Sequence, residues 1–383
     1  MTASSQERMG VISESGYGLI VDKPAGITSH DVVARVRRLT GIRRVGHAGT
    51  LDPFATGVLI ICVGRATRLV QFLVGLDKEY VATVRFGFAT DTQDLTGKQI
   101  TPLRSSNELA EVEIERVLGE FVGPQTQVPP MYSAKKVEGQ RLYRAARAGL
   151  EIERPSQAIE VYSISMDKGG IGRAGNGDGT MDVTVKIRCS SGTYVRTIAN
   201  DIGARLGVGA HLAALRRTAV GRFSIESAAT LTQMEEQSKL AREASGSASG
   251  VQLKQGRFFL TPAELVQHLP SVRLLDSDAL RIRNGQAIGL DAEGGRAAVG
   301  ADKPLDLVGL LGPEGSLIGI GAYSQNKGVI EPRVVLDTGD SGGTAPGASE
   351  RKRQGALGDP GDSEDRGDCE QRLASCAIIS SMK

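Results

Sequence analysis

Hydrophobic and polar residues recur with different periods along this chain, and the periods predict both strands and helices. From Tyr80 to Phe86 every second residue is apolar, which is typical of a strand with one buried face. The continuous apolar run 58–63, closed by Gly57 and Gly64, indicates a fully buried strand. Near the end of the chain, two apolar runs flank 312–315, whose composition predicts a hairpin turn. These segments therefore predict several strands, to which the helices below are added.

Helical spacing appears in two segments. The sequence from Thr28 to Asp31 fits a capping box, and apolar residues then follow at positions 32, 36 and 39 until Gly41 ends the helix. A second helix presents a face made of Tyr194, Ile198, Ile202 and Leu206. In the first helix, Arg35 and Arg38 point away from the apolar stripe.

Composition changes along the chain predict its domain boundaries. A flexible N-terminus (1–16) precedes a first domain (17–240), and a Ser/Gly/Ala-rich segment predicts a linker (241–257). The second domain (258–337) is rich in predicted strands, and the tail (338–383) is expected to be disordered. The Gly-rich segment 169–179 is expected to form a surface-loop insertion.

Length and composition exclude several protein classes. A chain of 383 residues has room for two or three domains and a sizeable core. The longest apolar run has six residues, so no membrane protein is expected. The first ten residues do not resemble a signal peptide, which predicts a cytoplasmic protein. The four cysteines form no CxxC pair and predict neither a disulfide framework nor a zinc site.

The charges are unevenly distributed although the net charge is only +2. Three windows are basic, and each can be read as solvated surface or as part of a polyanion-binding face. Because all three lie in the first domain, together they favour a polyanion partner. They comprise Arg35, Arg37, Arg38, Arg43 and Arg44; Lys135, Lys136, Arg141, Arg144 and Arg147; and Arg205, Arg216, Arg217 and Arg222.

Common catalytic signatures such as HExxH, GxSxG and the Walker motif are absent from the sequence, and its four histidines are too scattered to suggest a metal site. The segment 46–57 carries three glycines and an Asp52–Pro53 pair directly before the buried strand. A carboxylate in such a loop is held firmly and can be aimed at a substrate. On composition alone, an Asp–Pro pair such as Asp52–Pro53 more often starts a turn, and a lone histidine such as His47 is more often structural.

Six segments of the chain resemble, in the same order, those of the TruB-type tRNA pseudouridine synthases. The resemblance covers residues 17–235. In chain order, the segments are DKPAGITSHDVV (22–33), GHAGTLDPFATGVL (46–59), KEYVATVRFG (78–87), QVPPMYSAKKVEGQRLYRAAR (127–147), SSGTYVRTIANDIG (190–203) and GAHLAALRRTAVGRF (209–223). It implies an α+β pseudouridine-synthase fold with a central mixed, mainly antiparallel sheet. It also implies a thumb-like RNA-binding segment (124–152) and a small C-terminal β-rich PUA-like barrel.

The same resemblance assigns the site residues. It makes Asp52 the catalytic residue and Arg196 its ion-pair partner, which would lower the pKa of the carboxylate. Without the resemblance, Arg196 would be a surface arginine early in a helix. The remaining substrate-binding residues are His47, Tyr80, Tyr194 and Leu215, and the residues expected on the RNA backbone are Lys23, Arg43, Arg44, Lys135, Lys136 and Arg141.

The implied reaction converts the T-loop uridine of tRNA, position 55, to pseudouridine. The C1′–N1 bond breaks, the base rotates after being flipped out of the RNA, and a C1′–C5 bond forms. No metal or organic cofactor, no membrane and no obligate protein partner are expected, and a monomer is the default. Two alternatives remain open: a noncatalytic RNA-binding factor that keeps the scaffold, and a base-cleaving glycosylase.

Overall fold

The computed structural model describes most of the chain between residues 16 and 337. The described residues are 16–106, 108–133, 136–137, 140–141, 152–173, 178–245, 256–289, 307–324 and 326–337. They belong to one compact unit, Met1–Gly339. The expected flexible N-terminus, apart from Gly16, and the expected disordered tail lie outside them.

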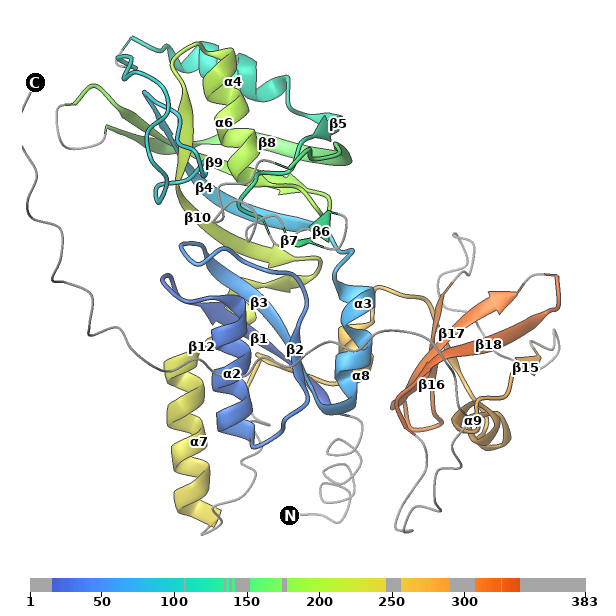
Figure 1. The fold of residues 1–383 in the computed structure, drawn as a ribbon. Helices are drawn as coiled ribbons and strands as arrows, with labels where there is room; N and C mark the ends of the chain where they lie inside the picture. The colour runs from blue at the N-terminus through green and yellow to red at the C-terminus, as the bar shows by residue number, and fades with distance from the viewer. Residues whose placement is uncertain are drawn as a thin grey trace, which may run out of the picture. The chain divides into compact units, whose positions relative to one another are not determined.

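A mixed sheet of eleven strands forms the larger part of the described structure (Figure 1). Its strands are β1 (Tyr17–Lys23), β2 (Val45–His47), β3 (Thr56–Val63), β4 (Lys78–Phe86), β5 (Gly123–Gln127), β8 (Gln157–Arg173), β9 (Met181–Cys189), β10 (Ala210–Val220), β11 (Phe223–Ser224), β12 (Ala229–Thr230) and β13 (Phe259–Leu260). The main path runs β12-β1-β3-β10-β4-β9-β8-β5. β1 and β12 are parallel, as are β3 and β10, and the other pairs are antiparallel. The predicted α+β class with a mixed, mainly antiparallel sheet is confirmed.

The two predicted strands of the first domain are present and follow their patterns. In β3 every residue from Gly57 to Val63 is buried, as expected for a continuous apolar run. In β4 the buried positions alternate with partly exposed ones from Tyr80 to Phe86. This alternation places Tyr80 on the inner face of the sheet.

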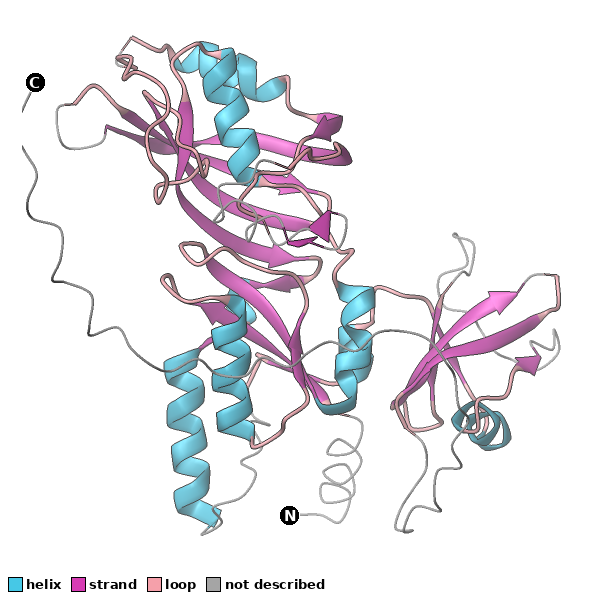
Figure 2. Ribbon diagram, viewed as in Figure 1, coloured by secondary structure: helices cyan, strands magenta, loops and turns pink. Residues whose placement is uncertain are grey.

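Helices lie beside the large sheet, and one helix, α9 (Asp276–Arg283), packs instead against a second sheet (Figure 2). They are α2 (Ser29–Thr40), α3 (Val70–Leu73), α4 (Glu111–Gly119), α6 (Val195–Arg205), α7 (Leu231–Ser245), α8 (Pro262–Leu265) and α9 (Asp276–Arg283), with short 3-10 helices η1 (Gly64–Leu69) and η2 (Ile225–Ser227). The predicted capping box is confirmed, because the amide of Asp31 donates to Thr28 Oγ1 (3.1 Å) and the amide of Thr28 donates to Asp31 Oδ2 (2.8 Å). Gly41 ends α2 with φ +70° and donates to the Arg37 carbonyl.

Two hydrophobic clusters divide the large sheet. One joins β1 and β3 to α2, η1 and α7, and the other joins β4, β8 and β9 to α4 and α6. The two halves meet where β3 lies beside β10. There the register pairs are only Arg216 with Thr56 and Arg217 with Gly57. The loop that carries Asp52 enters β3 at this junction, so the junction positions the site.

A second sheet follows near the end of the described chain. Its order is β14 (Ser271–Arg273), β16 (Val308–Leu311), β17 (Leu317–Ser324), β18 (Val329–Val335) and β15 (Ile288–Gly289), with α9 packed against it. The predicted hairpin is confirmed, since β16 and β17 are antiparallel and Gly315 donates to the Gly312 carbonyl in the turn. This part is therefore β-rich, as expected.

Three segments differ from their expected structure. Helix α7 continues to Ser245, so the expected linker (241–257) begins as helix. Residues 258–266, expected in the second domain, contribute β13, which pairs with β1, and several side chains to the core around β1. Strand β8 continues to Arg173 and pairs with β9, so 169–173 of the expected loop are strand. Composition did not show the last two differences because backbone pairing with another strand decides them.

Candidate active site

A cleft of about 260 Å³ gathers residues that lie far apart in the sequence. The loop before β3, strands β4 and β10, and the segment that leads into α6 all contribute to its walls. Five of the six residues predicted to act on or bind substrate line it: Asp52, Tyr80, Tyr194, Arg196 and Leu215. The structure thus brings together residues from four of the family-like segments.

The loop that carries Asp52 is held at several points. Ser29 at the start of α2 accepts the Leu51 amide at 2.9 Å and donates to the Leu51 carbonyl at 3.2 Å through its buried hydroxyl. The amide of Ala55 donates to the Asp52 carbonyl (3.1 Å), which closes a turn around Pro53. A buried hydroxyl that both donates and accepts fixes the neighbouring backbone. The backbone around Asp52 is therefore fixed, and the loop holds the carboxylate at the cleft.

Lys23 was expected on the RNA backbone, and the structure contradicts this. Its side chain is fully buried at the end of β1, and its ammonium donates to the carbonyls of Pro24 (2.9 Å), Ile27 (2.7 Å) and Pro53 (3.2 Å). A buried ammonium needs such partners because it has lost its hydration. The ammonium of Lys23 holds the carbonyl of Pro53, the residue that follows Asp52, and its burial leaves no exposed surface for a phosphate. Burial lowers the pKa of Lys23 to about 8, although the nearby Asp52 opposes this shift.

Arg196 pairs with Asp52 through two nitrogens. Its Nε lies 2.9 Å from Asp52 Oδ2, and its Nη2 donates to Asp52 Oδ1 at 3.3 Å. The Arg196 side chain is only 4% exposed, whereas the Asp52 carboxylate is 33% exposed at the cleft wall. The interpretation of Arg196 as a surface residue is wrong. Its remaining donors bond the carbonyls of Thr92 (3.0 Å) and Tyr132 (2.8 Å), so its position is fixed from three sides.

Asp94 completes this network and was not predicted. Its Oδ2 accepts from Arg196 Nη1 at 3.3 Å, and its Oδ1 accepts from the Thr96 amide (2.9 Å) and from the hydroxyls of Thr92 (2.8 Å) and Thr96 (2.6 Å). The side chain is 6% exposed. One arginine therefore bridges two carboxylates. The only sequence signal was the TQDLT pattern, which indicates a local turn and does not indicate a partner 102 positions away.

The acidity of Asp52 reflects competing effects. Burial raises its pKa above the ordinary value, Arg196 lowers it, Asp94 raises it, and Lys23 lowers it. The ion pair with Arg196 is present as predicted and lowers the pKa of Asp52 as expected, but burial has the larger effect and the net shift is upward. Ionisation of Asp52 therefore depends on its cationic neighbours.

Apolar surfaces stand next to this carboxylate. Tyr80 on β4 is 9% exposed and Leu215 on β10 is 8% exposed, and both line the cleft. Burial raises the pKa of Tyr80 and of Tyr194, so both hydroxyls stay protonated at neutral pH. The backbone of Tyr194 is held by Gln127, whose side chain accepts its amide (2.8 Å) and donates to its carbonyl (3.1 Å). The walls suit a flat, uncharged ring.

His47, the sixth predicted substrate-binding residue, lies at the end of β2 and is not part of the cleft lining. Its ring meets that of His30 edge-on, with centroids 5.8 Å apart. Burial lowers the pKa of His47, and the positive charges of His30 and Arg217 lower it further. The neutral form of the imidazole is favoured.

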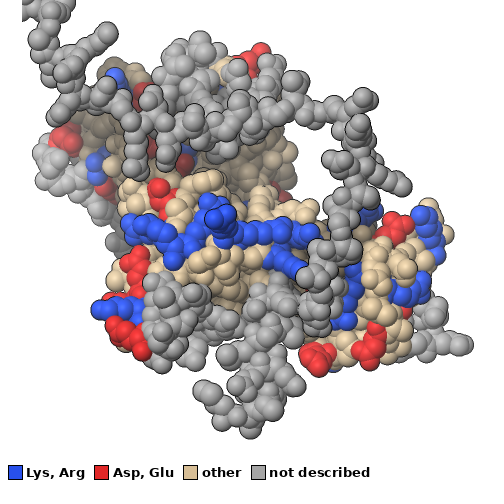
Figure 3. All heavy atoms as spheres, turned by 60° about the horizontal axis from the view of Figure 1, so that its bottom comes forward, with Lys and Arg blue, Asp and Glu red and all other residues tan. Residues whose placement is uncertain are grey.

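Arg43 and Arg44 are exposed in the loop after α2, as a contact with RNA phosphates requires. Arg44 Nε donates to Thr67 Oγ1 (2.7 Å), which orients its side chain. On the face that Figure 3 shows, Lys and Arg side chains gather in one band. The first basic window therefore forms an exposed cationic face.

The second basic window is only partly described. β6 (Lys136–Val137) and β7 (Gln140–Arg141) pair as a two-stranded hairpin. Lys135 and the side chains of Lys136 and Arg141 lie outside the described residues. Their expected contacts with RNA stay predictions.

The third basic window does not form a free cationic patch. Arg205 pairs with Glu120, Arg216 pairs with Asp22 at 2.7 Å, and Arg217 is 1% exposed. Opposite charges or burial thus account for three of its four arginines. The sequence could not show this, because the partners of Arg205 and Arg216 come from distant segments.

Known proteins show what the chain is similar to. Residues 37–195 match the TruB family pseudouridylate synthase N-terminal domain, and residues 196–266 match the tRNA pseudouridylate synthase B C-terminal domain. The tRNA pseudouridine synthase B of Thermobifida fusca is 41% identical over 320 residues, which cover 83% of this chain and 97% of that protein. The chain belongs to the TruB family of pseudouridylate synthases. The corresponding protein of Mycobacteroides abscessus is 41% identical over 306 residues, covering 80% of this chain and 94% of that protein. The predicted family and enzyme class, an isomerase, are confirmed.

Solved structures resemble this TruB-family chain in fold. A chain of a Cbf5–Nop10–Gar1 complex superposes with a TM-score of 0.64 at 26% identity and covers 86% of this chain and 87% of that chain. A chain of the archaeal box H/ACA sRNP Nop10–Cbf5 complex gives a TM-score of 0.61 at 26% identity, with 86% and 88% covered. These likenesses support the pseudouridine-synthase fold.

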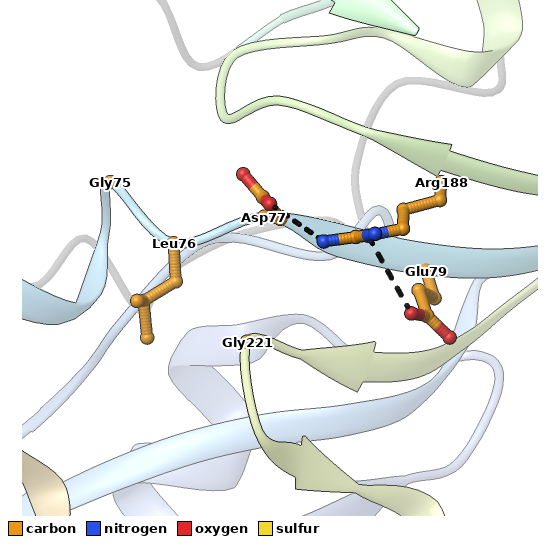
Figure 4. Close-up of a pocket in the computed structure, with 6 residues that line it drawn as sticks. All are labelled: Gly75, Leu76, Asp77, Glu79, Arg188 and Gly221. Atoms are coloured by element: carbon orange, nitrogen blue, oxygen red, sulfur yellow. Dashed lines mark hydrogen bonds and ion pairs between the residues drawn. The ribbon is translucent and has the colours of Figure 1, made fainter. Parts of the chain in front are cut away.

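A second pocket of about 250 Å³ in this TruB-family chain lies near the start of β4 (Figure 4). Arg188 reaches across it toward Asp77 (3.3 Å) and Glu79 (3.9 Å). Asp77 also accepts from the Tyr162 hydroxyl at 3.1 Å. Its charged groups bond to one another, and no aromatic side chain of the described residues lines it, unlike the Asp52 cleft with Tyr80 and Tyr194.

Within the described part of the chain, no group of three or more His, Cys, Asp or Glu side chains is placed to hold a metal ion. None of the described helices has the length and apolar character needed to cross a membrane. Cys62 and Cys189 are buried free thiols, and burial raises their pKa to about 12 and about 11.

Proposed function

We propose that this TruB-family enzyme converts the T-loop uridine of tRNA, position 55, to pseudouridine, with Asp52 as its catalytic carboxylate. The observation that carries the proposal is the ion pair of Asp52 with the buried Arg196 in a cleft that Tyr80, Tyr194 and Leu215 also line. The curated relatives with the same family segments are named tRNA pseudouridine synthase B, which supports tRNA as the substrate.

The reaction is an isomerisation that needs one carboxylate. Breaking the C1′–N1 bond leaves positive character on C1′, which Asp52 stabilises or attacks, as carboxylates do in glycoside hydrolysis. The uracil departs with the electron pair as a delocalised anion and stays bound. After it turns, C5 bonds to C1′ and loses its proton. Since uracil leaves without a proton, no second carboxylic acid has to protonate it.

The base must leave its stack to enter the cleft. Extrusion costs a few kcal/mol of stacking, and side chains in the pocket must replace it. Tyr80 stacks on the uracil, and Tyr194 and Leu215 close the pocket around it; all three line the cleft. His47, in its neutral form, enters the RNA loop near the vacated position.

Charged groups outside the cleft hold the RNA. Arg43 and Arg44 bind phosphates at the end of α2 away from Ser29; at 1.5 Å per residue that helix of 12 residues spans about 18 Å. The segment 124–152 closes on the T arm, and the second sheet forms a PUA-like RNA-binding barrel. Phosphate contacts position the RNA, so its shape and the extruded base determine recognition.

Tritium release tests the proposal. Unmodified tRNA labelled at uridine C5 is incubated with the wild type, with Asp52→Asn and with Asp77→Asn, a surface carboxylate paired with Arg188. The wild type and Asp77→Asn should release tritium with the RNA intact, and Asp52→Asn should release none while it still binds tRNA. Activity in Asp52→Asn would refute the role of Asp52. A wild type that binds without releasing tritium would identify a noncatalytic RNA-binding factor, and free uracil with abasic RNA would identify a glycosylase.

A further inference from the structure

Arg217 lies directly beneath the loop that carries Asp52. Its guanidinium donates to the carbonyls of Val58 (2.7 Å), Gly49 (3.2 Å) and Thr50 (3.4 Å). These acceptors stand before and after Asp52 in the sequence, so one planar group ties together both ends of the loop. Arg217 is 1% exposed and borders the cleft.

The strand arrangement explains how this side chain reaches the loop. β10 and β3 run parallel where Arg217 pairs with Gly57, and a Cβ at Gly57 would lie 2.1 Å from the carbonyl oxygen of Arg217. Only glycine permits so close an approach. The hydrogen-bond partners of the guanidinium are carbonyl oxygens, which carry partial charges. A buried guanidinium is retained at a cost, which indicates a role that an apolar residue could not fill.

The charge of Arg217 acts on the groups around the cleft. Burial lowers the pKa of Lys78 to about 8, and Arg217 lowers it further. Arg217 likewise adds to the effect of burial on the pKa of Lys23 and of His47. Burial raises the pKa of Tyr80, and the charge of Arg217 opposes that rise. The charge of Arg217 thus acts on residues of β1, β2 and β4 as well as on its own strand's neighbour β3.

We propose that Arg217 is a positioning residue for the reaction: it fixes the carbonyls on both sides of Asp52 and so sets where the carboxylate lies in the cleft. This inference rests on the proposed function. Arg217 takes no part in the bond changes. Without the guanidinium of Arg217, the loop that carries Asp52 is free to shift. A displacement of about 1 Å at a reacting group lowers a rate on the order of 100-fold.

The test compares Arg217→Gln, Arg217→Lys and the control Arg85→Gln. Arg85 is also a strand arginine with two hydrogen bonds, to Asp182 (2.7 and 2.8 Å), but it does not touch the loop. Single-turnover tritium release and tRNA binding are measured well below the melting temperature of each variant. Arg217→Gln should lose on the order of 100-fold in rate with tRNA affinity unchanged. Arg217→Lys, which keeps the charge, should recover part of the rate, and Arg85→Gln should match the wild type.

Hydrogen exchange separates a positioning role from a general loss of structure. Peptides covering 46–58 should exchange faster in Arg217→Gln than in the wild type, whereas peptides from β8 and β9 should not. If Arg217→Gln does not fold, the comparison of Arg217→Lys with the wild type decides. A folded variant that keeps the wild-type rate, or an unchanged 46–58 segment, would overturn the inference while the activity of the wild type still supports the proposed function. An inactive wild type would instead refute the proposed function, and hydrogen exchange would still report whether Arg217 holds the loop.

Discussion

Replacing Gly57 with alanine tests the junction at which the active-site loop enters the sheet. Gly57 has φ +104°, where an L residue is strained by about 1–2 kcal/mol. Its new Cβ would also lie 2.1 Å and 2.8 Å from the backbone O and N of Arg217. Backbone atoms cannot rotate away, so β3 and β10 must separate, and such overpacking costs about 1–3 kcal/mol. We expect Gly57→Ala to lower the free energy of unfolding by about 2–5 kcal/mol.

Two other Gly→Ala variants isolate the contributions. Gly41 has φ +70°, and a methyl group added there would meet no atom of the described chain within 4 Å beyond its own neighbours, so Gly41→Ala should show only the backbone strain of about 1–2 kcal/mol. Gly119, at the end of α4, has neither a positive φ nor such a neighbour among the described residues, and Gly119→Ala should be neutral or stabilise by up to about 1 kcal/mol.

Urea denaturation followed by circular dichroism gives the free energy of unfolding of each of the three variants, and single-turnover tritium release gives their reaction rates. Gly57→Ala should also slow the reaction, because the loop that carries Asp52 moves with β3, whereas Gly41→Ala should not. The reasoning is refuted if Gly57→Ala is no more destabilising than Gly41→Ala, or if it leaves the rate unchanged.

Three further predictions concern single side chains. Because burial raises the pKa of Asp52, the single-turnover rate should fall as the pH drops through that pKa. Asp94→Asn removes a negative charge that raises the pKa of Asp52, so the fall in rate should move to lower pH. A fall that moves to higher pH in this variant would contradict the network of Asp52, Arg196 and Asp94. Burial lowers the pKa of Lys78 from 10.5 to about 8, so the unfolded state binds more protons between these values. The free energy of unfolding should therefore rise with pH there, by up to about 1.4 kcal/mol per pH unit, and urea titrations of Lys78→Met should show a smaller rise. Ser29→Ala leaves the Leu51 amide and carbonyl without their buried partner, and thermal unfolding should report a loss of about 1–3 kcal/mol.

Local features were predictable from the sequence because their partners lie within a few residues. The helix after Thr28 is an example: Asp31 caps it three positions later, and Gly41 ends it. The strand from Tyr80 to Phe86 is another, since alternation alone assigns its buried face. The aimed position of Asp52 was also expected, from its loop and the buried strand after it.

Features that depend on distant partners were not predictable. The family resemblance assigned Lys23 to the RNA backbone, yet three carbonyls from the loops around it permit its burial. Asp94 bonds an arginine that follows 102 positions later. Residues 258–266 join the first sheet because β1 offers them a free edge, which their own composition does not reveal.

The arrangement around Asp52 fits the particular demand of an isomerase. Once the glycosidic bond breaks, water at C1′ would give hydrolysis, so the cleft has to exclude water, and the same exclusion raises the pKa of the carboxylate. Arg196 compensates by favouring the ionised form. Full neutralisation by Arg196 would weaken the interaction of Asp52 with a positive C1′, and Asp94 prevents it by taking part of the charge of the same guanidinium. In this bridged arrangement Arg196 has to favour ionisation of Asp52 against both burial and the charge of Asp94, which is why removing the charge of Asp94 is expected to lower the pKa of Asp52.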